Sequence, residues 1–238
     1  MAVESTAPRN GLKTVLDTIV APKEAFEAIR VAPTWGWALL IAILLSTIGT
    51  FLVIPAIQHA MASEWPSMVA KSPALSGMSA DKQAQQLAVT QGIIGFSWLF
   101  AIIGVPIFVL FDAVVMLIFD KIGHGEGSFV KYFAAASNIA VPACLGTLLG
   151  GIIVTIRGAS SFDSMASTQN VLPNLSLLAP GAGPKLAAFL SVFTPFTIWA
   201  TVLAAVAILV IGRTGKVPAI LAALVMMCVP ALFAIIGK

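Results

Sequence analysis

Residues 98–119 read WLFAIIGVPIFVLFDAVVMLIF, and Asp112 is the single ionisable side chain among them. A helix rises ~1.5 Å per residue, so about 20 apolar residues cross the ~30 Å hydrocarbon core of a bilayer. Across all 238 residues, 59% are hydrophobic and 10% are charged, whereas soluble domains carry about 25% charged residues. These values exclude a soluble domain and a disordered chain, and they predict an integral membrane protein.

Five apolar stretches of this kind predict an all-α fold, a polytopic bundle of transmembrane helices. They run from Trp35 to Ile57, from Leu87 to Phe119, from Phe133 to Ile156, from Leu186 to Ile211 and from Val217 to Ile236. The second is longer than one span. Ser79 is expected to cap its helix, with Asp81 in the first turn, so this helix is predicted to project from the membrane. Pro106 is expected to kink it.

The lysines and arginines between these stretches predict a cytoplasmic N-terminus, because the short loops on the cytoplasmic side of a membrane are enriched in both residues. Five spans then place the C-terminus outside. The basic residues assigned to the inside are Arg9, Lys13, Lys23, Arg30, Lys121, Lys131, Arg213 and Lys216, and those assigned to the outside are Lys71, Lys82, Arg157, Lys185 and Lys238.

The N-terminal residues carry an amphipathic pattern. Apolar side chains recur at helical spacing, with Lys13, Thr14, Asp17 and Thr18 on the other face. This predicts a helix that lies in the cytoplasmic interface of the membrane, packs on the ends of the spans, or does both. Pro22 is expected to end it and to begin a second short helix. The apolar residues, which form a candidate interface, are Leu12, Val15, Leu16, Ile19 and Val20.

Asp112 is the main candidate for chemistry inside the membrane. A charge in hydrocarbon costs at least ~2.5–3.5 kcal/mol, so the side chain is expected to face the bundle interior or water. One interpretation is a proton or cation site shared with Asn138 and the carbonyl group of Ile102, which Pro106 leaves free. The other is a structural hydrogen bond to Ser137 or Asn138.

Other features predict no chemistry. Motifs for nucleotide binding, metal-dependent hydrolysis and nucleophilic catalysis do not occur, so neither an enzyme nor a cofactor or metal is expected, and the weak net charge of +3 argues against nucleic acid. Residues 123–127 are interpreted as a flexible turn, and residues 157–185 as a long outer loop. Gly146 and Gly150 form a G-x-x-x-G pattern, a second candidate interface for helices or a homo-oligomer.

Several short motifs resemble, in order and spacing, those of the bacterial Yip1-domain membrane proteins. The first is IVAPKEAF at residues 19–26, followed by Pro33-Thr34-Trp35. The second is GEGSF at residues 125–129, followed by Ala136-Ser137-Asn138 and Pro142. The third is PFTIW at residues 195–199, and the last is Gly215-Lys216. The motif residues carried over are Pro22, Phe26, Gly125, Gly127, Phe129, Pro142, Phe196 and Trp199. Many relatives have an acidic residue just before the phenylalanine of the third motif, where this chain has Thr194-Pro195.

The resemblance implies one five-helix membrane domain over residues 35–238, preceded by an interfacial segment over residues 1–34. It also implies a place in a bacterial cytoplasmic membrane. Eukaryotic relatives act in vesicle traffic and associate with Rab-type GTPases and with each other. The short segment before the first span makes a Rab partner unexpected here. The leading expectation is therefore a non-enzymatic protein that organises membrane partners or lipid, and the alternative is a small transporter or channel that uses Asp112.

Overall fold

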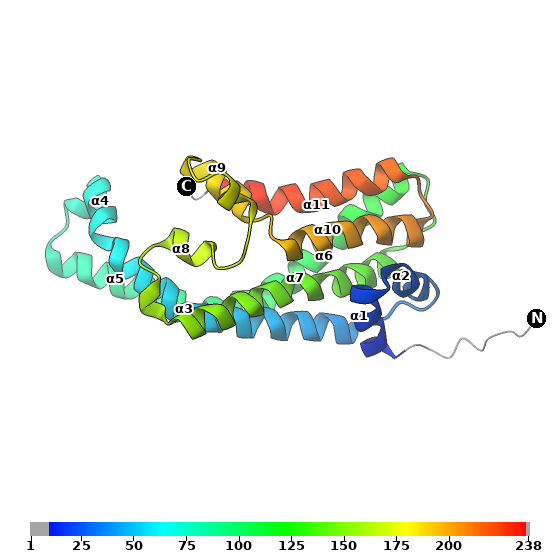
Figure 1. Cartoon of the computed structure of the whole chain (residues 1–238), viewed down its shortest axis with the longest axis horizontal. Helices are drawn as coiled ribbons and strands as arrows, with labels where there is room; N and C mark the ends of the chain where they lie inside the picture. Colours follow the sequence, from blue (N-terminus) through cyan, green and yellow to red (C-terminus); the bar gives the residue numbers. More distant parts are fainter. Residues whose placement is uncertain (1–9, 237–238) are drawn as a thin grey trace, which may run out of the picture.

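The computed structural model describes residues 10–236, and these residues form helices and no strand. Five helical segments are long and apolar enough to cross a membrane, which confirms the predicted all-α bundle of five spans. They run side by side along the long axis of the molecule (Figure 1). These segments are α3 (Gly36–Lys71), α6 (Ser97–Ile122), α7 (Phe129–Arg157), α10 with its π-helical extension η3 (Pro195–Ala207 and Ile208–Gly212), and α11 (Lys216–Ile236).

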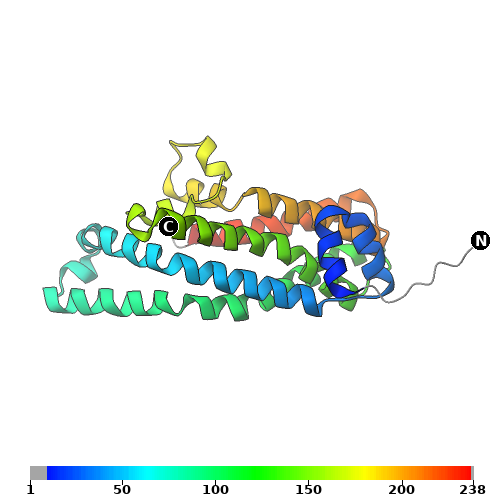
Figure 2. The same ribbon diagram turned by 60° about the horizontal axis from the view of Figure 1, so that its bottom comes forward.

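Shorter helices cover the two ends of this bundle. One end, called here the N-terminal end, carries the first two helices and the loops that follow α6 and η3; the opposite end is called the far end (Figures 1 and 2). Arg9 and Lys238, which enter the charge pattern, lie outside the described residues. The shorter helices are α1 (Gly11–Val20), α2 (Pro22–Val31), α4 (Pro73–Ser76), α5 (Ala80–Gly95), η1 (Ala159–Ser161), α8 (Met165–Gln169), η2 (Leu175–Leu178) and α9 (Pro184–Ser191).

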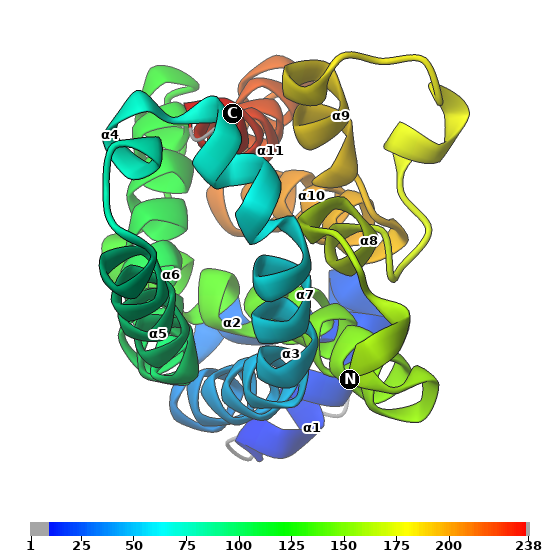
Figure 3. The same ribbon diagram turned by 90° about the vertical axis from the view of Figure 1, so that its left-hand side faces the viewer.

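The bundle is built around four helices that pack in a ring. Within it α6 contacts α7, α7 contacts α10, α10 contacts α11, and α11 contacts α6. Helix α3 lies outside this ring against α6 and α7, as the view along the bundle shows (Figure 3). The core of the ring is rich in alanine, which lets membrane helices approach closely. Its fully buried alanines include Ala113, Ala136, Ala204, Ala207 and Ala222.

Large apolar side chains point outward from the spans. On α3, Leu40, Leu44 and Phe51 follow one another along one exposed face, and α6 continues the pattern with Phe100 and Ile107. Soluble proteins seldom expose apolar surface of this extent. Because the exposed belt coincides with helices long enough to cross a bilayer, these side chains contact lipid.

Helix α3 extends well past the predicted end of the first span at Ile57. It continues to Lys71 through Pro55 and Pro66. A proline removes a single backbone hydrogen bond, and here α5 packs alongside this part of α3. Gln58 Nε2 donates to the carbonyl oxygen of Gln91 at 3.0 Å, and Gln91 Nε2 donates to that of Gln58 at 3.5 Å. The result is a helical hairpin that projects from the far end (Figure 1).

The second and fourth apolar stretches each contain a break. Helix α5 begins at Ala80 after Ser79, as predicted, although the Ser79 side chain makes no capping hydrogen bond. The helix breaks at Phe96, while α6 runs on through Pro106. The fourth stretch divides into α9 and α10, because Thr194 and Thr197 form a capping box that starts a new helix. The prediction of one continuous helix from Leu186 to Ile211 was therefore wrong.

Candidate functional site

Asp112 lines a pocket inside the ring of four helices. The pocket has a volume of about 120 Å³ and is otherwise bordered by apolar and threonine side chains. Among the described residues, none donates a hydrogen bond to the Asp112 carboxyl group. The residues that line the pocket are Asp112, Ile139, Ala143, Val192, Thr197, Ala200, Thr201, Met226, Met227 and Pro230.

Ser137 and Asn138 do not share this pocket with Asp112. Ser137 Oγ donates to the carbonyl oxygen of Phe133 at 2.8 Å. Asn138 Nδ2 donates to Ala134 at 2.8 Å and to Thr34 at 3.1 Å, both through carbonyl oxygens. The predicted hydrogen bond between Asp112 and either residue is therefore absent. Asn138 has a different role, since it fixes α7 to the segment that leads into α3.

A second aspartate, Asp120, is fully buried near the C-terminus of α6, at the N-terminal end of the bundle. Its Oδ2 atom accepts a hydrogen bond from the backbone N–H of Gly127 at 3.1 Å and lies 3.3 Å from Lys121 Nζ. Lys121 Nζ also donates to the carbonyl oxygens of Gly125 at 2.9 Å and Gly127 at 2.8 Å. The ammonium group thus bridges the end of α6 to the glycine-rich loop. Residues 123–127, expected to form a flexible turn, form a turn held by side-chain contacts.

Three glycines make room for the Asp120 cluster. A Cβ atom at Gly125 or at Gly212 would overlap Asp120 Oδ1, and one at Gly127 would overlap the ring of Tyr132. The same position at Gly212 lies 2.5 Å from the Tyr132 hydroxyl oxygen, so the carboxyl and phenol groups are neighbours. Because Gly125 and Gly127 lie in the loop after α6 and Gly212 is the last residue of η3, the cluster joins this loop to the end of η3.

Two further contacts connect these loops. The backbone N–H of Glu126 donates to the carbonyl oxygen of Gly212 at 2.9 Å. Arg213 has a φ of 54°, in the left-handed region, and its Nη1 lies 3.5 Å from a carboxylate oxygen of Glu126. Both side chains of this ion pair are mostly exposed, so the pair itself contributes little. The backbone contact and the buried aspartate hold the loops together.

The sequence did not single out Asp120, Tyr132 or Gly212. Asp120 stands at the end of an apolar stretch next to a lysine, a place where an acid is ordinarily solvated. The sequence offered one signal, which is that Asp120 shortly precedes a Gly-x-Gly pattern. The burial of Asp120, however, also depends on Gly212, which lies far along the chain. Only the packing of the two loops places this carboxyl group out of water.

Helix α1 packs on the bundle through one face and exposes another. Thr14, Val15 and Thr18 are buried against the N-terminal end, and Thr18 Oγ1 donates to the carbonyl oxygen of Thr14 at 2.8 Å. Leu16 and Val20 are 64% and 79% exposed. Of the predicted apolar stripe, Val15 is buried, Ile19 is half-buried and Leu12 is exposed. The two threonines assigned to the polar face thus form the packing face, because short hydroxyl side chains can bond their own helix.

The two glycines of the G-x-x-x-G pattern have different surroundings. A Cβ atom at Gly146 would lie 2.9 Å from the Phe196 ring, whereas one at Gly150 would meet its first neighbour, Leu172, only at 3.9 Å. The close crossing of α7 with α3 instead uses Gly151 and Gly49, where a Cβ atom would lie 2.6 Å from backbone atoms of the other helix. Gly146 thus packs against Phe196 of the same chain, whereas Gly150 has more space beside it.

The remaining motif residues have mainly structural places. Pro22 is the first residue of α2, and Phe26 is fully buried in the main core. Pro142 is buried in the middle of α7. Phe129 and Trp199 are exposed at 39% and 36%. The hydrogen bond from Asn138 to Thr34 shows that the first and second motifs, distant in the sequence, meet in the fold.

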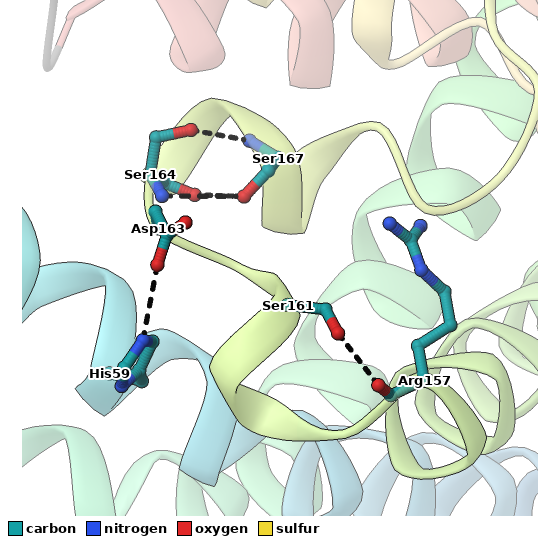
Figure 4. Close-up of polar contacts among 6 residues, drawn as sticks. All are labelled: His59, Arg157, Ser161, Asp163, Ser164 and Ser167. Atoms are coloured by element: carbon teal, nitrogen blue, oxygen red, sulfur yellow. Dashed lines mark hydrogen bonds and ion pairs between the residues drawn. The ribbon is translucent and has the colours of Figure 1, made fainter.

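The outer loop is attached to the far end of α3. His59 Nε2 lies 3.2 Å from Asp163 Oδ1, and Ser164 and Ser167 form a capping box at the start of α8 (Figure 4). The Arg157 guanidinium group lies 4.7 Å from the centre of the buried Phe162 ring. Groups of three or more potential metal ligands are not found among residues 10–236.

Comparison with known proteins identifies the family of this chain. The Yip1 domain family matches residues 16–237. The chain belongs to the Yip1 domain family. This Yip1-family chain is also 24% identical over 206 residues to membrane protein YknW of Bacillus subtilis (strain 168), covering 85% of the chain and 80% of that protein. No solved structure matches it.

Proposed function

We propose that this Yip1-family protein is a non-enzymatic membrane protein that organises membrane partners or lipid at its N-terminal end. The observation that carries the proposal is the exposed apolar edge of α1, formed by Leu12, Leu16 and Val20. The opposite face of α1 is packed on the bundle, so this edge is held in place at the end of the spans. An apolar helix edge fixed at the rim of a membrane domain suits the interfacial region or another membrane helix.

The charges at this end support a cytoplasmic orientation in a bacterial cytoplasmic membrane. The loops after α6 and after η3 lie at the same end as α1 and α2 (Figure 1). Both loops are flanked by lysine or arginine, as the positive-inside pattern requires. A relative named as a membrane protein in Bacillus subtilis is in keeping with this placement. Other membrane proteins, including a second copy of this chain, would meet the bundle within the same membrane.

The test is a pair of substitutions on the exposed edge, Leu16→Glu with Val20→Glu. Crosslinking and co-purification from native membranes, with analysis of bound lipid, should recover fewer partners or less lipid for this variant than for the wild type. Because both residues point away from the bundle, the variant should still insert and remain monodisperse in detergent.

The control carries the same added charge at the far end, as Gln85→Glu with Gln86→Glu on the exposed surface of α5. It should retain the wild-type set of partners and lipids. If the α1 variant and the control recover identical partners and identical lipid, the α1 edge has no organising role and the proposal fails.

A second function, transport of a proton, cation or small solute, is favoured by the pocket around Asp112. Ionisable residues inside membrane bundles often mark transport paths. In liposomes, Asp112→Asn should abolish coupled flux and leave the fold intact if the carboxyl group carries the coupling ion. Flux that is equal in wild-type and variant liposomes, or absent from both, would reject this function.

A further inference from the structure

We infer that the pocket between α6, α7, α10 and α11 binds a small organic ammonium ion, with its charged nitrogen on Asp112 and its apolar part against Met226 and Met227. This inference deepens the second function proposed above and rests on the same pocket. It names the ligand class, and its test measures binding and not transport. A protein that binds the ligand without moving it would satisfy this inference and reject only the transport function.

The first step concerns the carboxyl group. Asp112 lies within a span and borders the pocket, yet no described residue donates a hydrogen bond to it or forms an ion pair with it. Polar groups inside membrane bundles usually pair with one another or with backbone carbonyl groups. The other buried aspartate of α6, Asp120, follows that rule through Gly127 and Lys121. Asp112 is therefore the acid of α6 that is available to pair with a group from outside the chain.

The second step concerns the two threonines of α10 that line the pocket together with Asp112. Thr201 Oγ1 donates to the carbonyl oxygen of Thr197 at 2.8 Å. Thr197 Oγ1 lies 2.7 Å from the carbonyl oxygen of Val192 and also accepts from the N–H of Thr194. Their hydrogens are thus used within α10 and its cap, and none is left for the carboxyl group. The oxygen of Thr201 keeps a lone pair that can accept an N–H from a ligand.

The third step excludes a bare metal ion. Calcium and magnesium ions take about six to eight oxygen ligands. The pocket offers one carboxylate and two hydroxyl groups, and its other side chains carry no oxygen. An organic ammonium ion needs only a few acceptors and gains from apolar surroundings. Ile139, Ala143 and Pro230 supply such surroundings, and the methionines adapt their shape to different groups.

The fourth step is size. The pocket volume of about 120 Å³ is slightly below the ~150 Å³ of an apolar protein cavity that holds benzene. A single six-membered ring is therefore the largest apolar group that the pocket is expected to take, with a short amine arm directed to Asp112 at its border. Amines with two rings are expected to be excluded unless the helices move.

The fifth step distinguishes a binding pocket from a channel. Toward the N-terminal end the same four helices close on one another through fully buried side chains, among them Met116, Ala204 and Ala222. The pocket lies on the far side of this plug, where Val192 and Pro230 border it. A ligand that enters from the far end thus reaches Asp112 and stops there.

The experiment uses the full chain in lipid nanodiscs and benzylamine, which is protonated at neutral pH. Binding is measured by isothermal titration calorimetry and by saturation-transfer NMR, with empty nanodiscs subtracted. Saturable binding to the wild type is expected. Benzyl alcohol, which has the same shape without the charge, should bind at least tenfold more weakly. Asp112→Asn should weaken benzylamine binding at least tenfold, whereas Asp163→Asn in the outer loop should leave it unchanged.

A second variant covers the case in which Asp112→Asn does not fold. Ala200→Leu keeps the carboxyl group and fills the pocket from α10, so it should abolish binding of benzylamine while the protein stays helical by circular dichroism. Absence of saturable binding to the wild type overturns the inference. Equal affinity in wild type and either folded pocket variant, or equal affinity for benzyl alcohol, overturns it as well.

Discussion

At the scale of single residues, the two buried aspartates of α6 have opposite surroundings. Asp120 accepts from a backbone N–H and contacts an ammonium group, whereas Asp112 borders a pocket without a donor from the chain. A buried hydrogen-bonding group that loses its partner costs about 1–3 kcal/mol. The same substitution at the two sites therefore removes a network in one case and no hydrogen bond in the other.

Asp120→Ala is expected to lower the free energy of unfolding by about 1–3 kcal/mol, because it leaves the buried N–H of Gly127 without its acceptor and removes the carboxylate from beside the Lys121 ammonium group. Asp112→Ala should change it by less than about 1 kcal/mol, since no protein donor loses a partner. Thermal unfolding in detergent, followed by circular dichroism, measures both. Equal loss in the two variants would contradict the different environments described for them.

Gly212→Ala tests the contact between the two loops at the N-terminal end. The added Cβ atom would overlap Asp120 Oδ1, and overpacking of this kind typically costs about 1–3 kcal/mol. Gly104→Ala on α6 is the matched control, because a Cβ atom there meets nothing within 4 Å. The melting temperature should fall for the first variant and stay level or rise for the second. A Gly212→Ala protein as stable as the wild type would show that the glycine is not required.

At the scale of elements, the crossing of α3 with α7 depends on one glycine from each helix. Neighbouring glycines on α7 allow a direct comparison, because a Cβ atom at Gly151 would press on the carbonyl group of Gly49 while one at Gly150 has room. Gly151→Ala should force the helices apart and destabilise the protein by about 1–3 kcal/mol.

Gly150→Ala should be neutral for stability in the same unfolding measurement. If partners bind through this side of α7, Gly150→Leu would reduce their recovery without lowering the melting temperature. Destabilisation by Gly150→Ala equal to that of Gly151→Ala would contradict the assigned crossing.

At the scale of the whole molecule, the proposed orientation places the loop after α6 in the cytoplasm and the outer loop outside. Glu126→Cys and Gln169→Cys introduce thiols at exposed positions of these loops. In intact bacterial cells a membrane-impermeant maleimide should label only Gln169→Cys, and it should label both after the cells are broken. The native Cys144 and Cys228 lie within spans and should stay unlabelled in the wild type. Labelling of both loops in intact cells would reject the topology.

The sequence by itself determined the class of the protein, the number of spans and the approximate start of most of them. Long apolar stretches are a local property of the chain, and a bilayer of fixed thickness converts them directly into helices. The sequence also placed Asp112 inside a span and grouped the loop charges. The predictions from sequence were wrong where a local signal overrode the apolar composition. Thr194 and Thr197, for example, cap a new helix in a stretch whose apolar composition predicted a continuous helix.

Only the tertiary structure decided which polar groups meet. It buried Asp120 beneath Gly212, separated Asp112 from Asn138, and turned Thr14 and Thr18 inward in place of Leu16. Each outcome depends on contact between residues far apart in the chain, and several sequence arrangements with the same hydropathy would pack differently. Inside a bilayer the hydrophobic effect does not select one helix face over another, so close packing and hydrogen bonding make that choice.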